Sequence, residues 1–551
     1  MSADRLLVTN AVIAPESRGL SAILIDKGDF AAVVPMEDAG ALRTPGLREV
    51  DLGRRTVLPG IDDSHVHAYE LGRSLTAVDL RGTKSIDELH QRLRSATPDA
   101  NGWIRGHGWD GTVIHGTAPD GGPCAADIDE VLGGIPALLG DITGHAGLCN
   151  SAALLAAGIS AQTADPAGGS FPRDVHGVPT GVVLEAAVGV INDAIPDISA
   201  LERVQALLAA QDFLLTNGII SVTDPGLGPG ARTLMDGTGD LSTIDAYRSL
   251  ETDGRLHMRV QVMLLFGGLG GTTEHDVITG LDAWGAPMRA GRDGLVSVAQ
   301  LKVFADGIPR SRTAWLREPY DDCTHGHLQL GGSTDEERVA NLNGIVAGAV
   351  ARDWQVGAHA IGDLTISSYL DAIAAAGDSR ASRHYVIHGD LIDIADYARM
   401  VEMNIGLNSN PSIRWTVGHR VSALIGDERN RNRQRLRTAR DLGVTICSAS
   451  DAPVASPDWR LIMACAMTRR LSDDPDYRDG ETLTPSEAIA SMTSAAAWQS
   501  HEDTWRGSIR PGMSADLVVL DRCVDWDEPW SLTEANVVTT MTRGHVVKGT
   551  L

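Results

Sequence analysis

Short apolar runs, each ended by glycine, proline or a polar residue, recur along the middle of the chain. Ala-rich runs with helical character, such as residues 367–376, lie between them. Apolar strands that alternate with helices are typical of a parallel sheet covered on both faces. Strands are expected at residues 56–65, 218–224, 259–266, 296–307, 355–363, 383–390, 404–411 and 443–453. Eight such units close a (β/α)8 barrel, so we predict an α/β protein built on a TIM-like barrel.

The two ends of the chain have a different pattern, with short strands separated by turn residues. The N-terminal strands are expected at residues 6–14, 21–25 and 31–35, and the C-terminal strands at 516–520, 536–540 and 545–547. We therefore predict a small β-sandwich domain built from residues 1–58 and 505–551, with the barrel at residues 59–504.

The interval between the first two barrel strands is too long for one βα unit, which needs about 30 residues. It contains the glycine- and tryptophan-punctuated segments RGHGWDGT, GDITGHAGLCNSAAL and GVPTGVVLEAA. We interpret residues from about 76 to 185 as an α/β insertion after strand one. A second long interval begins just beyond Lys302, and its Pro- and Arg-punctuated start predicts a loop that covers the active face of the barrel.

Composition narrows the classes of partner. The formal net charge of -25 over 551 residues disfavours nucleic acid and anionic membranes, which both need basic patches. The six cysteines form no CxxC pair, which is typical of free thiols in a reducing compartment. No apolar run approaches the roughly 18 residues of a membrane span. We expect a cytoplasmic protein that acts on a small molecule, without nucleic-acid or membrane partners; a homodimer is compatible with the sequence.

Polar residues with metal-binding chemistry end several of the predicted barrel strands. His65 and His67 form an HxH pair after the first strand, and residues i and i+2 of a strand point the same way, so both imidazoles can reach one ion. The other candidates are Lys302, His359, His388 and Asp451. The carboxyl ends of barrel strands meet on one face. An isolated HxH pair is a weak signal, but this set indicates a metal centre.

Lys302 has three interpretations. It is a core lysine with a buried partner, a Schiff-base lysine for a carbonyl substrate, or a lysine carboxylated by CO2 that bridges two metals. The histidines at the neighbouring strand ends favour the carboxylated form.

These motifs resemble the amidohydrolase superfamily, and within it the YtcJ-like group called amidohydrolase family 3; N-substituted formamide deformylases resemble the chain in the same way. The matching segments include LPGIDDSHVHAYELGRSL, GHGWDGT, GHAGLCNSAAL, LKVFADG with SRTA, HAIGD, NSNPS, SDAPV and GSIRPGMSADLVVLD. They extend from about Thr56 to Asp521. The resemblance implies the same metal-site residues, with Lys302 as the bridging lysine and zinc or another divalent metal, one or two ions, as the cofactor.

The chain departs from the family pattern at two places. The family usually has an acidic residue just before the sixth-strand histidine, where this chain has Ile387, with Asp390 two residues after His388. Arg310 stands where the family's DG-x-x-GSRTA run has glycine. Both departures leave the predicted metal ligands intact. They indicate that the substrate differs from the usual substrate of the family.

Five further residues are candidates for substrate binding. Trp109 and His145 lie in the insertion and match family motifs, whereas Arg310, Trp315 and Trp415 follow strands four and seven. Ordinary packing or a structural role inside the insertion is the alternative for the aromatic and insertion residues.

The predicted chemistry is hydrolysis of a C–N bond, other than a peptide bond, in an amide, formamide or carbamate-like molecule. A divalent metal lowers the pKa of water to about 7, and Asp451 takes the water proton and returns it to the leaving nitrogen. Three alternatives are a deaminase of a cyclic amidine, a Schiff-base lyase that uses Lys302, and a non-catalytic scaffold. The lyase is disfavoured because it leaves the histidines without a role. The scaffold is disfavoured because it predicts that metal ligands are lost, and none is lost in this sequence.

Overall fold

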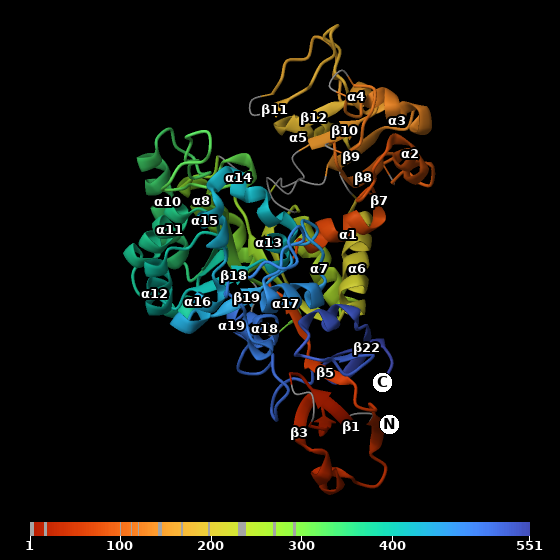
Figure 1. Cartoon of the computed structure of the whole chain (residues 1–551), viewed down its shortest axis with the longest axis vertical. Coiled ribbons are helices and arrows are strands. Elements are labelled where there is room, and N and C mark those ends of the chain that lie inside the picture. Colours follow the sequence, from red (N-terminus) through yellow and green to blue (C-terminus); the bar gives the residue numbers. More distant parts are fainter. Residues whose placement is uncertain are drawn as a thin grey trace. The chain divides into compact units, whose positions relative to one another are not determined.

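A computed structural model gives the arrangement of the chain (Figure 1). It describes residues 5–15, 19–99, 101–111, 113–118, 121–141, 146–166, 169–196, 199–229, 239–267, 271–289 and 294–551.

Eight parallel strands form the central sheet, as the apolar runs predict. They are β6 (Ile61–Asp63), β13 (Ile219–Leu227), β14 (Arg259–Leu264), β15 (Val296–Phe304), β16 (Gln355–Ala360), β17 (Tyr385–His388), β18 (Gly406–Ser409) and β19 (Ile446–Ser448). Each pairs in parallel with the next in chain order. The first and last strands are joined just beyond their ends by a bridge between Val66 and Ala452. The sheet is thus a nearly closed TIM-like barrel.

Helices separate the barrel strands in sequence, as a βα repeat requires. They include α6 (Ala200–Thr216), α7 (Ser242–Thr252), α8 (Glu274–Gly280), α10 (Asp335–Val350), α11 (Asp363–Ala375), α12 (Ile394–Glu402), α16 (Leu436–Leu442) and α17 (Trp459–Thr468). Figure 1 shows α10, α11 and α12 side by side on the outer side of the sheet. Among the described residues, no helix combines the length and the apolar character needed to cross a membrane.

The predicted single barrel strand over residues 56–65 is wrong, because the chain forms two strands there. β5 (Thr56–Pro59) pairs with β1 (Arg5–Ile13) and β20 (Leu517–Leu520), whereas β6 belongs to the barrel. Gly60 separates them, and a Cβ at this position would lie 2.3 Å from the Cδ1 atom of Ile220. The switch between sheets therefore needs a residue without a side chain.

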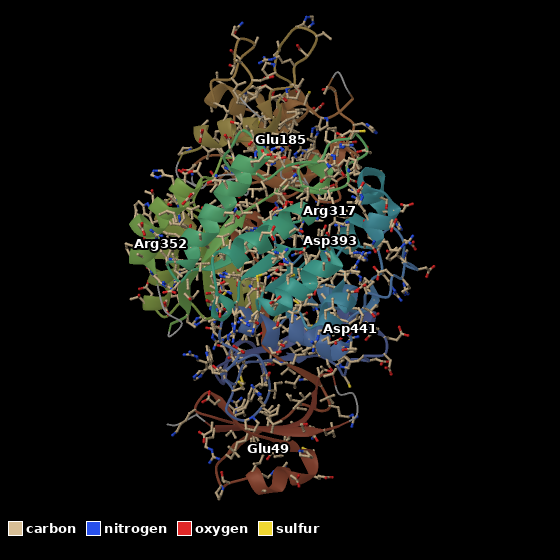
Figure 2. The ribbon with its side chains drawn as sticks, turned by 90° about the vertical axis from the view of Figure 1, so that its left-hand side faces the viewer. Glu49, Glu185, Arg317, Arg352, Asp393 and Asp441 are labelled. Atoms are coloured by element: carbon tan, nitrogen blue, oxygen red, sulfur yellow. The ribbon has the colours of Figure 1, made fainter. Side chains whose placement is uncertain are left out.

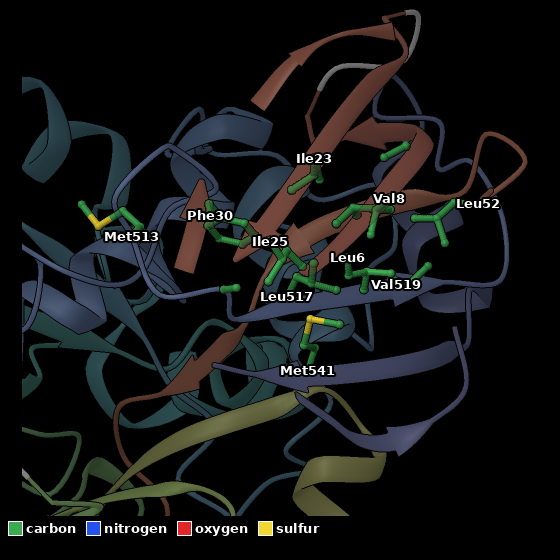
Figure 3. Packing of buried hydrophobic residues seen from close by; sticks show 13 residues of the cluster. Leu6, Val8, Ile23, Ile25, Phe30, Leu52, Met513, Leu517, Val519 and Met541 are labelled. Carbon is green, nitrogen blue, oxygen red and sulfur yellow. The ribbon is translucent and has the colours of Figure 1, made fainter. Parts of the chain in front are cut away.

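Strands from both ends of the chain form one sheet. Its order is β22 (His545–Gly549), β21 (Val537–Thr542), β20, β5, β1, β2 (Ser21–Asp26) and β3 (Asp29–Pro35), and β4 (Arg48–Asp51) also pairs with β1. Figure 3 shows apolar side chains from the two ends packed together, among them Val8, Ile25, Leu517 and Met541. The two ends therefore share one hydrophobic core.

Residues 68–210 make up most of a second compact unit with its own sheet. The strand order is β11 (Gly169–Ser170), β12 (Val182–Glu185), β10 (Ala146–Cys149), β9 (Ala137–Asp141), β8 (Ile104–Trp109) and β7 (Val78–Asp79). Its helices are α1 (Ala68–Thr76), α2 (Ile86–Arg94), α3 (Ala125–Leu132), α4 (Ser151–Ala156) and α5 (Ala186–Ala194). Two buried apolar clusters supply its interior.

Candidate metal centre

Three predicted ligands meet where the barrel closes. His65 and His67 follow β6, and Asp451 follows β19. The Nε2 atoms of His67 and His65 lie 3.0 and 3.4 Å from Oδ1 of Asp451. One ligand atom from each residue lies within 4.8 Å of those of the other two, and all three residues are buried. Two imidazole nitrogens and one carboxylate oxygen at this spacing fit a divalent ion such as zinc.

The two other predicted histidines extend this group. His359 is the penultimate residue of β16 and His388 is the last residue of β17, and their ring centroids are 4.5 Å apart. The ring of His388 lies 5.7 Å from that of His65, which is 5.2 Å from His67. Four imidazoles from three strands therefore form one continuous row.

Lys302 projects from β15 and is only 2% exposed. Its Nζ atom lies 4.9 Å from the ring centroid of Phe304. Burial lowers the pKa of this amine to about 7, although the charge of Asp451 opposes the shift. A neutral amine is the form that reacts with CO2 or with a carbonyl carbon, so both reactive interpretations of Lys302 stay open.

Burial also favours the neutral form of His65, His359 and His388. It lowers the pKa of His65 and His359 well below 6.5, and nearby cationic groups, including Lys302, add to the effect. The pKa of His388 is lowered by burial as well, although Asp451 opposes this. Neutral imidazole is the form that binds metal.

Hydrogen bonds to the second ring nitrogen orient three of the imidazoles. Nδ1 of His67 lies 3.1 Å from the carbonyl oxygen of Pro225, and Nδ1 of His388 lies 2.7 Å from Oδ1 of Asn410. Nε2 of His359 lies 3.4 Å from the carbonyl oxygen of Gly307. An N–H donated to such an oxygen leaves the other ring nitrogen as a lone pair for a metal. Asn410 was not predicted, although it lies in the NSNPS segment at a strand end.

Asp63 is a second residue that the sequence analysis missed. Its Oδ1 atom accepts hydrogen bonds from the backbone N–H of Ser450, at 3.0 Å, and of His65, at 3.4 Å. Asp451 N–H donates to the carbonyl oxygen of His65 at 2.9 Å. Asp63 thus joins the two chain segments that carry His65 and Asp451. In the sequence, the position of Asp63 two residues before His65 indicates that its side chain lies near the predicted metal ligands.

Two residues of the centre have an unusual backbone conformation. His388 has φ 69° and Asp451 has φ 61°. Non-glycine residues rarely adopt positive φ, and such conformations concentrate at functional sites, where the surrounding structure holds them in place. His388 is the last residue of β17 and Asp451 lies shortly after the end of β19, so this conformation occurs where the chain leaves the barrel strands.

The predicted substrate-binding residues have mixed environments. Arg310 is exposed in a short 3-10 helix (Pro309–Ser311), and Trp315 is half-buried in the same loop after β15. Trp415, half-buried on α13 (Pro411–Val417), lies 6.2 Å from the ring centroid of Trp530. Trp109 is buried, and its Nε1–H donates to the carbonyl oxygen of Leu139 inside the second unit. His145 lies outside the described residues.

At the departure from the family pattern next to His388, both Ile387 and Asp390 have structural contacts. Ile387 packs with Met263 and Tyr385 in a buried apolar cluster. Asp390 accepts hydrogen bonds from Arg433 at 2.6 Å and from Gln434 at 2.7 Å. Asp390 therefore anchors the segment that follows β18.

Comparison with known proteins adds family information. A family model described as "Amidohydrolase family" matches residues 48–550. The Bacillus subtilis (strain 168) protein YtcJ, named as an amidohydrolase, is 28% identical over 544 residues, which cover 95% of this chain and 97% of that protein. The N-substituted formamide deformylase of Arthrobacter pascens is 26% identical over 526 residues, 91% of this chain and 90% of that enzyme.

A solved structure agrees with the fold. The crystal structure of an uncharacterized metal-dependent hydrolase from Pyrococcus horikoshii OT3 matches with a TM-score of 0.74 and 24% identity, covering 96% of this chain and 98% of that one. At this identity the likeness concerns the fold.

Proposed function

The chain belongs to the amidohydrolase family, and from this premise we propose that it hydrolyses a C–N bond of an amide, formamide or carbamate-like small molecule. The observation that carries the proposal is the buried group formed by His65, His67 and Asp451. The similarity to a formamide deformylase supports the choice of bond.

The residues that would hold the metal are those at the barrel strand ends. They are His65, His67, Lys302, His359, His388 and Asp451. The donor set suits zinc or another divalent metal, as one or two ions, and a carboxylated Lys302 would supply a further carboxylate to hold them. When bound, such an ion supplies an acidified water and polarises the scissile carbonyl.

Asp451 is the proposed proton carrier. Burial opposes its ionisation, but the hydrogen bond with His67 and the electrostatic effect of the neighbouring basic groups His67, His388 and Lys302 outweigh burial and lower its pKa. The ionised carboxylate accepts a proton from the attacking water on one oxygen and returns it to the leaving nitrogen as the C–N bond breaks.

The test is a metal analysis combined with a panel of amides, formamides and carbamates. Purified protein should contain about one to two equivalents of a divalent metal and should release amine from at least one class. Fully active protein without metal would contradict the proposal. Release of ammonia from a cyclic amidine, with no amide hydrolysis, would favour the deaminase instead.

A further inference from the structure

Asp306 is a buried carboxylate directly beyond the strand that carries Lys302. It is 0% exposed. Its Oδ1 atom accepts the N–H of Ile361 at 3.0 Å, and Oδ2 accepts the N–H of Gly362 at 2.9 Å. Oδ2 also accepts the hydroxyl of Thr365 at 2.7 Å and the N–H of Trp315 at 3.2 Å. Four donors on one buried carboxylate make a rigid connection.

These donors come from two different segments. Trp315 belongs to the loop after β15, whereas the other three donors lie at or just after the end of β16. The segments are in close contact, because a Cβ at Gly362 would lie 2.0 Å from the carbonyl oxygen of Trp315. Gly362 precedes the first residue of α11, and the positive end of a helix dipole favours an anion there.

The same loop packs on the neighbouring strand ends. Ala314, Leu316 and Tyr320 share a buried cluster with Ile361 and with residues beyond β17 and β18, namely Leu391, Val421 and Ile425. The loop that was predicted to cover the active face is therefore anchored by apolar contacts and by Asp306.

The anchored turn also contacts His359. The N–H of Ala305 donates to the carbonyl oxygen of His359 at 3.1 Å. The carbonyl oxygen of Gly307 lies 3.4 Å from Nε2 of His359, and Oδ1 of Asp306 lies 3.8 Å from the same nitrogen. A proton held on Nε2 by this carbonyl leaves Nδ1 as the lone pair of the ring.

We propose that Asp306 is a positioning residue, which fixes the Gly307 carbonyl against His359 and so sets the orientation and tautomer of that imidazole for metal binding. The inference rests on the proposed function, since it takes His359 as a metal ligand. The inference gives a role to Asp306 of the LKVFADG segment. This residue contributes no ligand atom to the group of His65, His67 and Asp451.

The test replaces the carboxylate by an amide. Asp306→Asn turns an NH2 group toward N–H donors and should displace the turn at Gly307. We expect metal affinity, measured by competition with a chelator, to fall about 10- to 100-fold, the range for residues that orient a metal ligand. The variant should lose activity to the same extent at limiting metal and regain part of it at excess metal.

Asp393→Asn is the matched control. Asp393 also contacts this loop, through Arg317 at 3.4 Å, but its side chain is 50% exposed. Figure 2 shows these two side chains next to each other. Exposed pairs of this kind contribute little, so metal affinity should equal that of the wild type.

A second pair of variants covers the case in which Asp306→Asn does not fold. Thr365→Val removes one donor to Asp306 and should weaken metal binding, whereas Thr365→Ser keeps the hydroxyl and should not. Wild-type affinity in folded Asp306→Asn, or in Thr365→Val, would overturn the inference while leaving the proposed function intact. A wild-type protein that neither binds metal nor hydrolyses the panel would instead contradict the proposed function.

Discussion

Burial sets the protonation state of the residues at the metal centre. Removal from water disfavours every charged form, so His65, His359, His388 and Lys302 shift toward the neutral form. Among these residues Asp451 shifts toward its charged form, because its hydrogen bond with His67 and the electrostatic effect of the neighbouring basic groups outweigh its burial. The centre thus combines several ligands that are shifted toward the neutral form with one carboxylate that is shifted toward its charged form.

Asp451→Asn tests the proton carrier at the residue scale. The amide has the same shape but cannot accept the proton, so kcat should fall at least ~100-fold while most bound metal is kept. Because the lowered pKa keeps Asp451 ionised at neutral pH, wild-type activity should fall on the acid side as Asp451 is protonated, and the variant should lack this acidic limb. The measurement is a pH–rate profile with metal content at each point. Near-normal turnover in folded, metal-replete protein would remove this mechanism.

Lys302→Ala separates the two reactive interpretations of the lysine. If Lys302 is carboxylated, the variant should lose most activity, and short carboxylic acids should restore part of it by occupying the vacated position. The measurement is activity with and without added acetate or formate. A wild-type protein trapped by borohydride in the presence of a carbonyl substrate would point instead to the Schiff-base lyase.

At the scale of the elements, buried carboxylates connect the ends of barrel strands to distant segments. Asp63 joins β6 to the turn after β19, and Asp390 joins the end of β17 to Arg433. Asp306 does the same between the loops after β15 and β16. A barrel fixes the directions of its strands, whereas these contacts fix the loops that the strands carry.

Arg506 connects β6 to a distant segment by a buried ion pair with Asp62. Its side chain is 1% exposed and contacts Asp62 at 2.7 Å and Glu502 at 2.5 Å. Arg506→Met would leave two buried carboxylates without their cation, which should lower the free energy of unfolding by about 3–5 kcal/mol. Urea denaturation followed by tryptophan fluorescence measures this change.

The control is Arg522→Met. Arg522 pairs with Asp521 at 3.0 Å, but its side chain is 46% exposed. Water and ions screen such pairs, so the urea midpoint should stay at the wild-type value. Equal midpoints for the Arg506 and Arg522 variants would show that the buried pair contributes no more than the surface pair.

At the scale of the whole molecule, the residues proposed to hold the metal lie where the barrel closes. β6 and β19 are the first and last strands of the sheet, and a β-bridge between Val66 and Ala452 joins the segments beyond them. We call this junction between β6 and β19 the seam of the barrel. An ion bound by His65 and His67 on one side and by Asp451 on the other would stabilise the seam. Chelation should therefore lower the melting temperature, because a metal at 1,000 times its Kd stabilises the native state by about 4 kcal/mol.

Differential scanning calorimetry with and without a chelator measures this effect, and hydrogen exchange locates it. Faster exchange should appear first near Val66 and Ala452, and added metal should reverse it. A melting temperature that does not change on complete metal removal would contradict a structural contribution of the ion at this seam.

The sequence alone determined the barrel fold and the polar residues that lie at the ends of its strands. Parallel strands buried on both faces must be apolar along their whole length, so residues such as 218–224 and 259–266 are recognisable from composition. The carboxyl ends of such strands converge, and therefore His65, His67 and Asp451 could be grouped although 384 positions separate His67 from Asp451.

The tertiary structure decided what local pattern does not encode. Gly60 looks like an ordinary turn residue, and only its contact with Ile220 shows why the chain changes sheets there. Asp306, Asp390 and Asn410 are polar residues near strand ends, like the predicted ligands, but their partners lie up to 59 residues away in sequence. Periodicity reports which face of an element is buried, whereas the partner of a buried polar group depends on which loops meet in three dimensions.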